Sequence, residues 1–396
     1  MKLAVVGFGQ CGGRVADEFS RFNASARLHR GIQMITGTFA VNTDAADLTS
    51  LSGIKSDFRH RILIGNRKTG GHGVGKINEL GAEIAFEDGD KVIEAIRSSR
   101  NFYEADAFML VASAAGGTGS GSMPIMTKII KDRFQDKRVY SLVVLPFDHE
   151  EKTDARTFYN AATCLKAVYQ VADAVFLVDN QRYVEKDASL INNMTAINRL
   201  IAAPFYDLLC AGEEKKAKHI GARLLDAGDI MQTISGWTVL GYGTSPIPTL
   251  RNPFEFRGHF RKKSTETHKG IQAMDEAISN LSLNCNPADS GSALYLLSAP
   301  QKDMNMDLVK ELGDYLSGIA PEAIIRYGDY PRGGGMLKIT VILSQLSSVA
   351  KVKAYYDRMP DMMAEQQKKD EENEAKLKEL IHASAGVPSL FSGNGS

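Results

Sequence analysis

Short apolar runs that alternate with helix-length segments dominate the first half of the sequence. They recur at residues 2–7, 38–41, 62–64, 107–112, 140–145 and 174–178. Runs of this length without polar interruption are typical of strands that are buried on both faces of a parallel sheet. Because strand and helix patterns alternate, the sequence predicts an α/β fold with a doubly wound, Rossmann-like sheet. Ligands of such sheets bind outside the carboxyl ends of the strands.

The second half of the sequence predicts a smaller α/β domain. A helical pattern at about 188–210 leads into a charged loop, and strand-like runs follow at 236–243, 293–299 and 336–344, with an irregular, turn-rich excursion at 245–263. From about Val352 the chain is helical and highly charged, with a kink expected at Pro360 and a mobile Ser/Gly-rich end. The predicted domains are the first sheet at 1–187, a central connecting helix and loop at 188–222, the smaller domain at 223–355, and a charged helix with a flexible tail at 356–396.

Composition excludes several classes of partner. The 396 residues include 47 Lys and Arg against 47 Asp and Glu, so no net field attracts nucleic acid or an anionic membrane. No apolar stretch approaches membrane-spanning length, and no targeting segment precedes the first strand pattern. The cysteines form no CxxC pair, which argues against a zinc site and a disulfide framework; they are Cys11, Cys164, Cys210 and Cys285. These features predict a cytoplasmic, reduced protein with no transmembrane segment.

Three glycine-rich segments follow strand patterns. Residues 7–13 (GFGQCGG) match GxGxxG, residues 69–75 read TGGHGVG, and residues 114–121 (AAGGTGSG) precede a helical pattern at 123–134 whose Pro124 suits a first turn. Backbone amides and helix N-termini at such junctions can enclose an anion. The first motif alone fits an NAD-dependent oxidoreductase equally well, and glycines that serve only tight turns are a further alternative. A nicotinamide enzyme needs one pyrophosphate loop, so three loops favour another phosphate ligand.

The same segments resemble a known family. AAGGTGSG fits the nucleotide signature of the tubulin/FtsZ family, and GQCG at 9–12 is similar to the first phosphate loop of tubulins. VNTDAADL at 41–48 is similar to the FtsZ segment after the second strand, and residues 1–13, 71–83 and 328–335 look most like CetZ, the archaeal tubulin-like branch. The resemblance implies GTP or GDP with Mg²⁺, held by backbone amides and helix dipoles rather than by a loop lysine. It implies nucleotide contacts from Gly9, Gln10, Cys11, Gly12, Gly13, Arg14, Asn42, Asp44, Gly70, Gly71, Gly116, Gly117, Thr118, Gly119 and Ser120. A Cβ at Gly117 or Gly119 is expected to occupy the space of a phosphate.

The resemblance also implies how the guanine base and the ribose are held. Asn180 and Asn198 correspond to the two asparagines that recognise guanine, although without the resemblance they would be interpreted as a turn residue and a solvated helix residue. Met194 stands where the family has an aromatic ring that stacks on the base, and a thioether can also pack on a purine. Glu150 corresponds to the ribose contact. Asp154 falls near the place where FtsZ carries an arginine.

Two acids far from the glycine loops are the candidate catalytic groups. Asp226 and Asp229 lie three residues apart at a predicted helix start, so their carboxylates share a face. Local chemistry alone interprets them as an N-cap and a first-turn acid. The segment resembles the tubulin/FtsZ loop whose acids polarise the water that attacks GTP on the adjacent subunit. The sequence departs from the family at Leu224, where FtsZ has asparagine, and at Asp229, where CetZ-like chains often have glutamate.

These features predict a GTPase that polymerises head to tail into protofilaments, with a role in cell shape rather than division. The alternatives are an NAD-dependent oxidoreductase and a scaffold that binds GTP without hydrolysing it. Leu390 and Phe391 in the tail are a candidate docking peptide for a partner protein, against the alternative of an inert frayed end.

Overall fold

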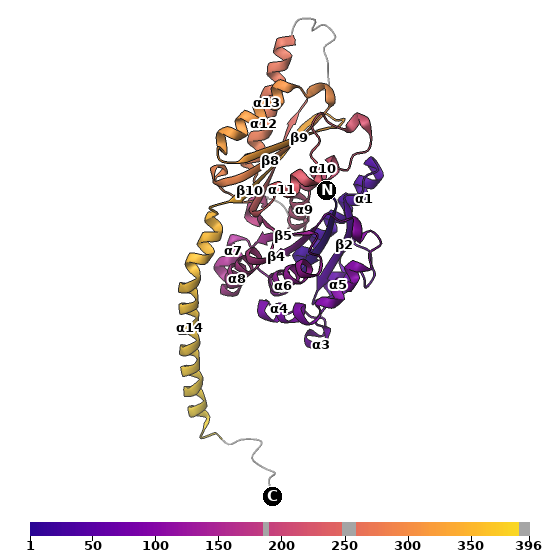
Figure 1. Ribbon diagram of the computed structural model, residues 1–396. Coiled ribbons are helices and arrows are strands. Elements are labelled where there is room, and N and C mark those ends of the chain that lie inside the picture. Colours follow the sequence, from indigo (N-terminus) through magenta and orange to yellow (C-terminus); the bar gives the residue numbers. More distant parts are fainter. Residues whose placement is uncertain (185–189, 248–258, 388–396) are drawn as a thin grey trace. The chain divides into compact units, whose positions relative to one another are not determined.

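One mixed sheet organises the chain, in the order β3-β2-β1-β4-β5-β6-β7-β10-β8-β9 (Figure 1). The structure is a computed structural model that describes residues 1–184, 190–247 and 259–387. The strands are β1 (Leu3–Phe8), β2 (Ile35–Asn42), β3 (Arg61–Leu63), β4 (Ala107–Ser113), β5 (Arg138–Leu145), β6 (Ala174–Asp179), β7 (Gly236–Pro246), β8 (Ser290–Ala299), β9 (Ile324–Pro331) and β10 (Met336–Leu346). Strands β1 to β6 pair in parallel, and each strand is almost wholly buried except β3, so the predicted doubly wound α/β fold is confirmed.

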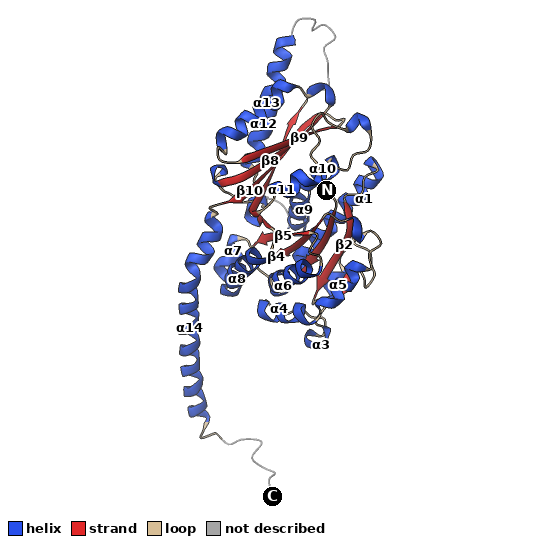
Figure 2. Cartoon of the chain, in the orientation of Figure 1, coloured by secondary structure: helices blue, strands red, loops and turns tan. Residues whose placement is uncertain are grey.

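Helices supply most of the rest of the described chain (Figure 2). They are α1 (Gly9–Arg30), α2 (Ala45–Thr49), α3 (Asn66–Thr69), α4 (Asn78–Glu87), α5 (Gly89–Arg97), α6 (Gly117–Arg133), α7 (Asp148–Thr153), α8 (Ala155–Val171), α9 (Leu190–Ala202), α10 (Pro204–Ala211), α11 (Ala227–Thr233), α12 (His259–Ser279), α13 (Met306–Ile319) and α14 (Ala350–Ser384). No helix in the described part of the chain combines the length and the apolarity needed to cross a bilayer.

The second half of the sheet continues the first half edge to edge. Strand β7 pairs in parallel with β6 over three residue pairs only, Ala174–Phe176 against Gly236–Thr238, and then runs antiparallel to β10. Strand β9 (Ile324–Pro331) was not expected from the sequence, because Arg326, Gly328 and Asp329 interrupt the apolar pattern that begins with two isoleucines. The predicted helical run at 188–210 is two helices, since Pro204 begins α10 after Ala203.

The glycine-rich segment at 114–121 is largely helical rather than a loop. Helix α6 begins at Gly117, so Pro124 lies inside the helix and not in its first turn as predicted. Glycine permits this start because α4 crosses α6 closely. A Cβ on Gly121 would lie 2.0 Å from the carbonyl oxygen of Asn78, and one on Gly81 would lie 2.5 Å from that of Gly117. Tertiary packing here outweighs the low helix propensity of glycine.

A buried group of charged side chains joins the end of α1 to the second half of the chain. The Arg30 guanidinium lies 2.7 Å from Asp207 of α10, and both side chains are less than a tenth exposed. Tyr330 of β9 donates to Glu214 at 3.1 Å, and Arg332 forms an ion pair with the same carboxylate at 3.1 Å. Burial by itself would lower the pKa of Arg30, but Asp207 raises it above its usual range.

The chain divides into two compact units, residues 1–350 and 351–396. The second unit continues α14, which contains Pro360 and carries an i,i+4 ion pair between Glu374 and Lys378 (2.8 Å). The tail residues Leu390 and Phe391 lie outside the described residues, as does most of the predicted excursion at 245–263.

Candidate functional site

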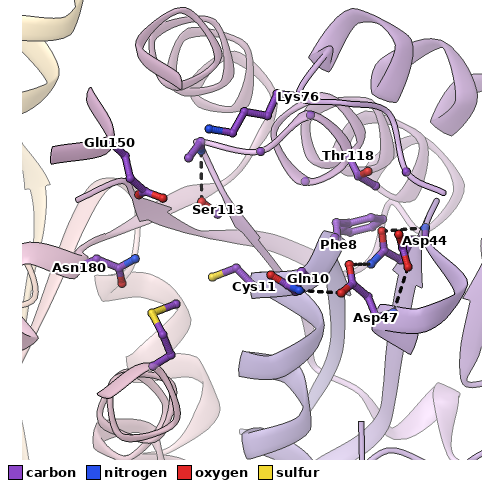
Figure 3. A pocket seen from close by; sticks show the side chains of 18 of the residues that line it. Phe8, Gln10, Cys11, Asp44, Asp47, Lys76, Ser113, Thr118, Glu150 and Asn180 are labelled. Atoms are coloured by element: carbon purple, nitrogen blue, oxygen red, sulfur yellow. Dashed lines mark hydrogen bonds between the residues drawn. The ribbon is translucent and has the colours of Figure 1, made fainter. Parts of the chain in front are cut away.

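An open cavity of about 300 Å³ lies at the carboxyl ends of the parallel strands, where a doubly wound sheet binds its ligands (Figure 3). The last residues of β1, β2 and β4 (Phe8, Asn42 and Ser113) line it, and so do residues just after β5 and β6. The full lining is Phe8, Gly9, Gln10, Cys11, Asn42, Asp44, Asp47, Gly73, Lys76, Ser113, Ala115, Gly116, Gly117, Thr118, Gly119, Phe147, Glu150, Asn180 and Met194. Most of the predicted nucleotide-binding residues are therefore brought together in one cavity.

Two long helices begin at this cavity without side-chain caps. Helix α1 follows Phe8 and helix α6 follows Gly116. Neither of these N-cap residues has a side chain that accepts a hydrogen bond from the first amides of its helix. Neither helix has an acidic residue in its first turn. The first amides of a helix have no intrahelical partner and carry the positive end of its dipole. The cavity is thus bordered by two open helix N-termini, an arrangement suited to a phosphorylated ligand.

The glycines of segments 7–13 and 114–121 serve two purposes. Some allow two parts of the chain to approach closely, and others line the cavity. Gly9 has a φ of +68°, and a Cβ there would lie 3.1 Å from the amide nitrogen of Gly119. Gly12 does not line the cavity; a Cβ on it would lie 2.1 Å from the carbonyl oxygen of Val111, so it allows α1 to pack on β4. Among the other predicted residues, Gly13, Arg14 and Ser120 also lie outside the cavity lining, and Ser120 donates to the carbonyl of Gly116.

The expectation for Gly117 and Gly119 needs correction. A Cβ on Gly117 would lie 2.6 Å from Val74 and 2.8 Å from backbone atoms of the Lys76–Ile77 peptide. One on Gly119 would approach the carbonyl oxygens of Phe8 and Ser113 at 3.1 and 3.2 Å. The backbone at both positions lines the cavity, but a Cβ at either would point into protein rather than into ligand space. Gly116 is different, because a Cβ there meets nothing within 4 Å in the cavity wall.

The glycine-rich loop at 69–75 and the residue that follows it line the cavity with residues other than those predicted. Gly70 and Gly71 lie outside the lining, whereas Gly73 and Lys76 contribute to it. Glycines 70, 71, 73 and 75 all have positive φ, and Lys76 continues the series at +64°. The isolated bridge between Asp44 and His72 attaches this loop to the segment after β2.

Two carboxylates, those of Asp44 and Asp47, lie at one end of the cavity (Figure 3). Asp44 caps α2 by accepting from the amides of Ala46 and Asp47 at 2.8 and 3.1 Å. Asp47, which was not predicted, accepts from the side-chain amides of Gln10 (2.7 Å) and Asn42 (3.0 Å). Within the described part of the chain, no group of three or more His, Cys, Asp or Glu side chains is placed to hold a metal ion by itself.

The other end of the cavity combines one unpaired polar atom with apolar and sulfur-containing side chains. Asn180 is 5% exposed, and its Oδ1 has no hydrogen-bond partner. Met194 and Cys11 also line the cavity, and burial raises the pKa of the Cys11 thiol to about 12, which keeps it protonated. Asn198 is buried on α9, one turn after Met194, and does not line the cavity.

Glu150 is held by its own helix start. Its carboxylate accepts from the amide of Phe147 at 3.0 Å, so the backbone fixes its position at the cavity wall. Phe147 and Phe8 also line the cavity, although nothing in the sequence pattern distinguishes them from other apolar residues near strand ends.

The two candidate catalytic acids lie apart from this cavity. Asp226 is the exposed N-cap of α11, and its Oδ1 accepts from the amide of Asp229 at 2.8 Å. The Asp229 carboxylate is 43% exposed and lies 3.7 Å from Nε of Arg326. The local interpretation as an N-cap and a first-turn acid is therefore correct within one chain. Both side chains remain accessible to solvent in spite of these contacts.

Comparison with known proteins decides the family. The model of the tubulin/FtsZ family GTPase domain matches residues 2–186, and that of the tubulin-like CetZ C-terminal domain matches residues 187–361. Tubulin-like protein CetZ1 of Haloferax volcanii is 31% identical over 89% of this chain and 90% of its own. The chain belongs to the CetZ branch of the tubulin/FtsZ family. The predicted family is thereby confirmed.

Solved CetZ structures share the fold. The GDP-bound CetZ1 monomer from H. volcanii superposes with a TM-score of 0.77 at 29% identity, covering 93% of this chain and all of the other. The GTPγS-bound CetZ2 protofilament from the same organism gives a TM-score of 0.79 at 27% identity with the same coverage. Both proteins hold a guanine nucleotide, and the second is assembled into a protofilament.

Proposed function

We propose that this chain binds GTP and GDP in the cavity at the strand ends. The observation that carries the proposal is the pairing of two uncapped helix N-termini, at α1 and α6, with an unpaired buried carbonyl on Asn180 at the other end. The helix ends suit the phosphates, and the Asn180 side chain suits a purine edge that offers a donor. The guanine nucleotides bound by the CetZ structures support this assignment. An NAD-dependent oxidoreductase is the weaker alternative, since membership of this family supplies no such chemistry.

Mg²⁺ fits this site as a companion of the phosphates. It is usually bound by one or two carboxylates together with substrate phosphates and water, so three protein ligands are not needed. Asp44 and Asp47, which line the cavity together with Thr118, are the carboxylates that could hold Mg²⁺. Bound Mg²⁺ would neutralise phosphate charge there.

Hydrolysis is proposed to require a second copy of the chain. Within the cavity lining, the carboxylates of Asp44, Asp47 and Glu150 already accept backbone or side-chain amides. Asp226 and Asp229 lie elsewhere and face solvent. Head-to-tail assembly that brings these acids over the nucleotide of the next subunit would complete the site, with the acids positioning the attacking water. The protofilament formed by CetZ2 supports this arrangement.

The test mixes two defective variants. Asp226→Asn keeps the cap, because asparagine caps as well as aspartate, but removes the charge. Gly116→Asp places a carboxylate in the open space of the cavity and should block nucleotide binding. Each variant alone should lack GTPase activity, and co-assembled mixtures should recover part of it. Asp314→Asn, an exposed change on α13, is the matched control and should retain full turnover.

Turnover per subunit in the unmodified protein should also rise with protein concentration, because the site is shared. Concentration-independent turnover, or no recovery in mixtures whose co-assembly is demonstrated by sedimentation, would place the catalytic groups within one chain. Assembly without phosphate release in GTP would favour the non-hydrolysing scaffold. We further propose a cytoplasmic role in cell shape rather than division, tested by the shape and division of cells that lack the protein.

A further inference from the structure

Lys76 is the one positively charged side chain among the described residues that line the cavity. Figure 3 shows it at the rim, beside the loop that carries Ser113. The glycine-rich segment at 114–121 contains no lysine, so this cation comes from a different segment, the loop between α3 and α4. The sequence-based hypothesis, in which backbone amides and helix dipoles hold the phosphates, includes no such positively charged side chain.

The backbone of Lys76 is held in a conformation that disfavours a side chain. Its φ of +64° belongs to the left-handed region, which glycine adopts without cost and a residue with a Cβ does not. The neighbours Gly73 and Gly75 have the same sign of φ. Glycine would be less strained here, so the presence of lysine is a reason to ask what its side chain contacts.

The start of α8 fixes this residue against the glycine-rich loop. The Asn160 side chain, wholly buried, donates to the carbonyl oxygens of both Lys76 (2.9 Å) and Ala115 (3.0 Å). Arg156 Nε also donates to the Lys76 carbonyl at 3.3 Å. Because the Lys76–Ile77 peptide also packs on Gly117, the lysine is fixed beside the N-terminus of α6.

The ammonium group is held by partners that a phosphate can replace. Lys76 Nζ lies 2.7 Å from Asp154 Oδ2 and 3.1 Å from Thr157 Oγ1. The Lys76 side chain is 47% exposed and that of Asp154 is 34% exposed, so water screens the pair and it contributes little to stability. The hydrogen bond from Lys76 is also the main reason that the pKa of Asp154 lies below its usual range.

We propose that Lys76 is a phosphate-binding residue of the nucleotide cavity, held ready by Asp154 and Thr157. This inference rests on the proposed nucleotide binding. It assigns to the loop between α3 and α4 the positive side chain that the glycine-rich segment at 114–121 lacks.

The experiment measures the binding of GDP and GTPγS to the full chain and to four variants by competition with a fluorescent guanine nucleotide. Lys76→Gln and Lys76→Gly should each weaken both nucleotides about tenfold or more, because a charge-assisted hydrogen bond is lost. Lys76→Arg should stay within about threefold of the unmodified protein, since the charge is kept. Lys68→Gln removes a nearby lysine that pairs with Glu83 and Glu87 outside the cavity, and it should change nothing.

Lys76→Gly separates the side chain from the backbone, because glycine relieves the positive φ. Unchanged affinity in Lys76→Gly, or equal losses in Lys76→Arg and Lys76→Gln, would overturn the assignment. Thermal unfolding of each variant without nucleotide shows which of them fold. If Lys76→Gln does not fold, the comparison of Lys76→Gly with Lys76→Arg decides the question. Failure of the unmodified protein to bind either nucleotide would refute the proposed function and this inference with it, whereas failure of the inference alone leaves that binding intact.

Discussion

Adding one methyl group at successive glycines of the AAGGTGSG segment should separate folding from ligand binding. On Gly117 the new Cβ would lie 2.6 Å from Val74 Cγ2 and 2.8 Å from two backbone atoms of the Lys76–Ile77 peptide, which cannot rotate away. Overpacking of this kind costs about 1–3 kcal/mol. On Gly116 the Cβ meets nothing within 4 Å, and its φ of −79° and ψ of 166° suit alanine. Gly116→Ala should therefore remain within about 1 kcal/mol of the unmodified protein.

Urea unfolding of the nucleotide-free protein, followed by fluorescence of the single tryptophan, Trp237, measures both values. Gly318→Ala, exposed on α13 with no atom within 4 Å of the new Cβ, is the control and should stabilise by about 0.5–1 kcal/mol. Nucleotide titration should then show weaker binding by Gly116→Ala despite its intact fold. The reasoning fails if Gly117→Ala is as stable as the unmodified protein, or if Gly116→Ala is destabilised to the same extent.

Four further outcomes are expected. Burial by itself would raise the pKa of Glu214, but hydrogen bonds from backbone amides and Tyr330, together with the charge of Arg332, lower it below its usual value in the folded state. The contribution of Glu214 to stability is therefore present above the unfolded pKa and is lost as pH falls through the folded pKa. Glu214→Gln should flatten the acid side of a plot of unfolding free energy against pH. Asp207→Ala leaves the buried Arg30 unpaired and should cost about 3–5 kcal/mol in urea unfolding. Asn180→Leu removes an unpaired buried carbonyl, so the nucleotide-free protein should keep its stability while the preference for GTP over ATP in competition binding falls by about 1–3 kcal/mol. Deletion of residues 387–396 should leave GTPase activity and sedimentation with GTP unchanged; lost sedimentation would show that the tail acts in assembly.

The sheet and most of the cavity could be predicted because their signals are local. Buried parallel strands require uninterrupted apolar runs, and loops that approach a ligand or another loop closely require glycine, so Gly9 and Gly116 are visible in the sequence. Asp44 and Asn180 were found through the resemblance to the family, since each follows a strand in a matching segment.

The remaining features depend on contacts between distant segments. Lys76 carries no sequence signal for a positive φ, because the side chains that hold its carbonyl, Asn160 and Arg156, lie about eighty residues later. The start of α6 was missed because its glycines predict a loop until the close crossing of α4 is known. Strand β9 was missed because its pairing with β8, rather than its own composition, makes it a strand.

The cap at Asp226 has a consequence for how such chains diverge. Its Oδ1 is bonded to the Asp229 amide within the same chain, so selection for folding alone retains Asp, Asn, Ser or Thr at this position. An aspartate there can persist in a lineage that has lost the ability to break down its nucleotide. The Asp229 carboxylate contributes less to the fold, because its contact with Arg326 is a partly exposed ion pair of 3.7 Å. Position 229, rather than 226, is therefore where relaxed selection on turnover would first become visible among descendants.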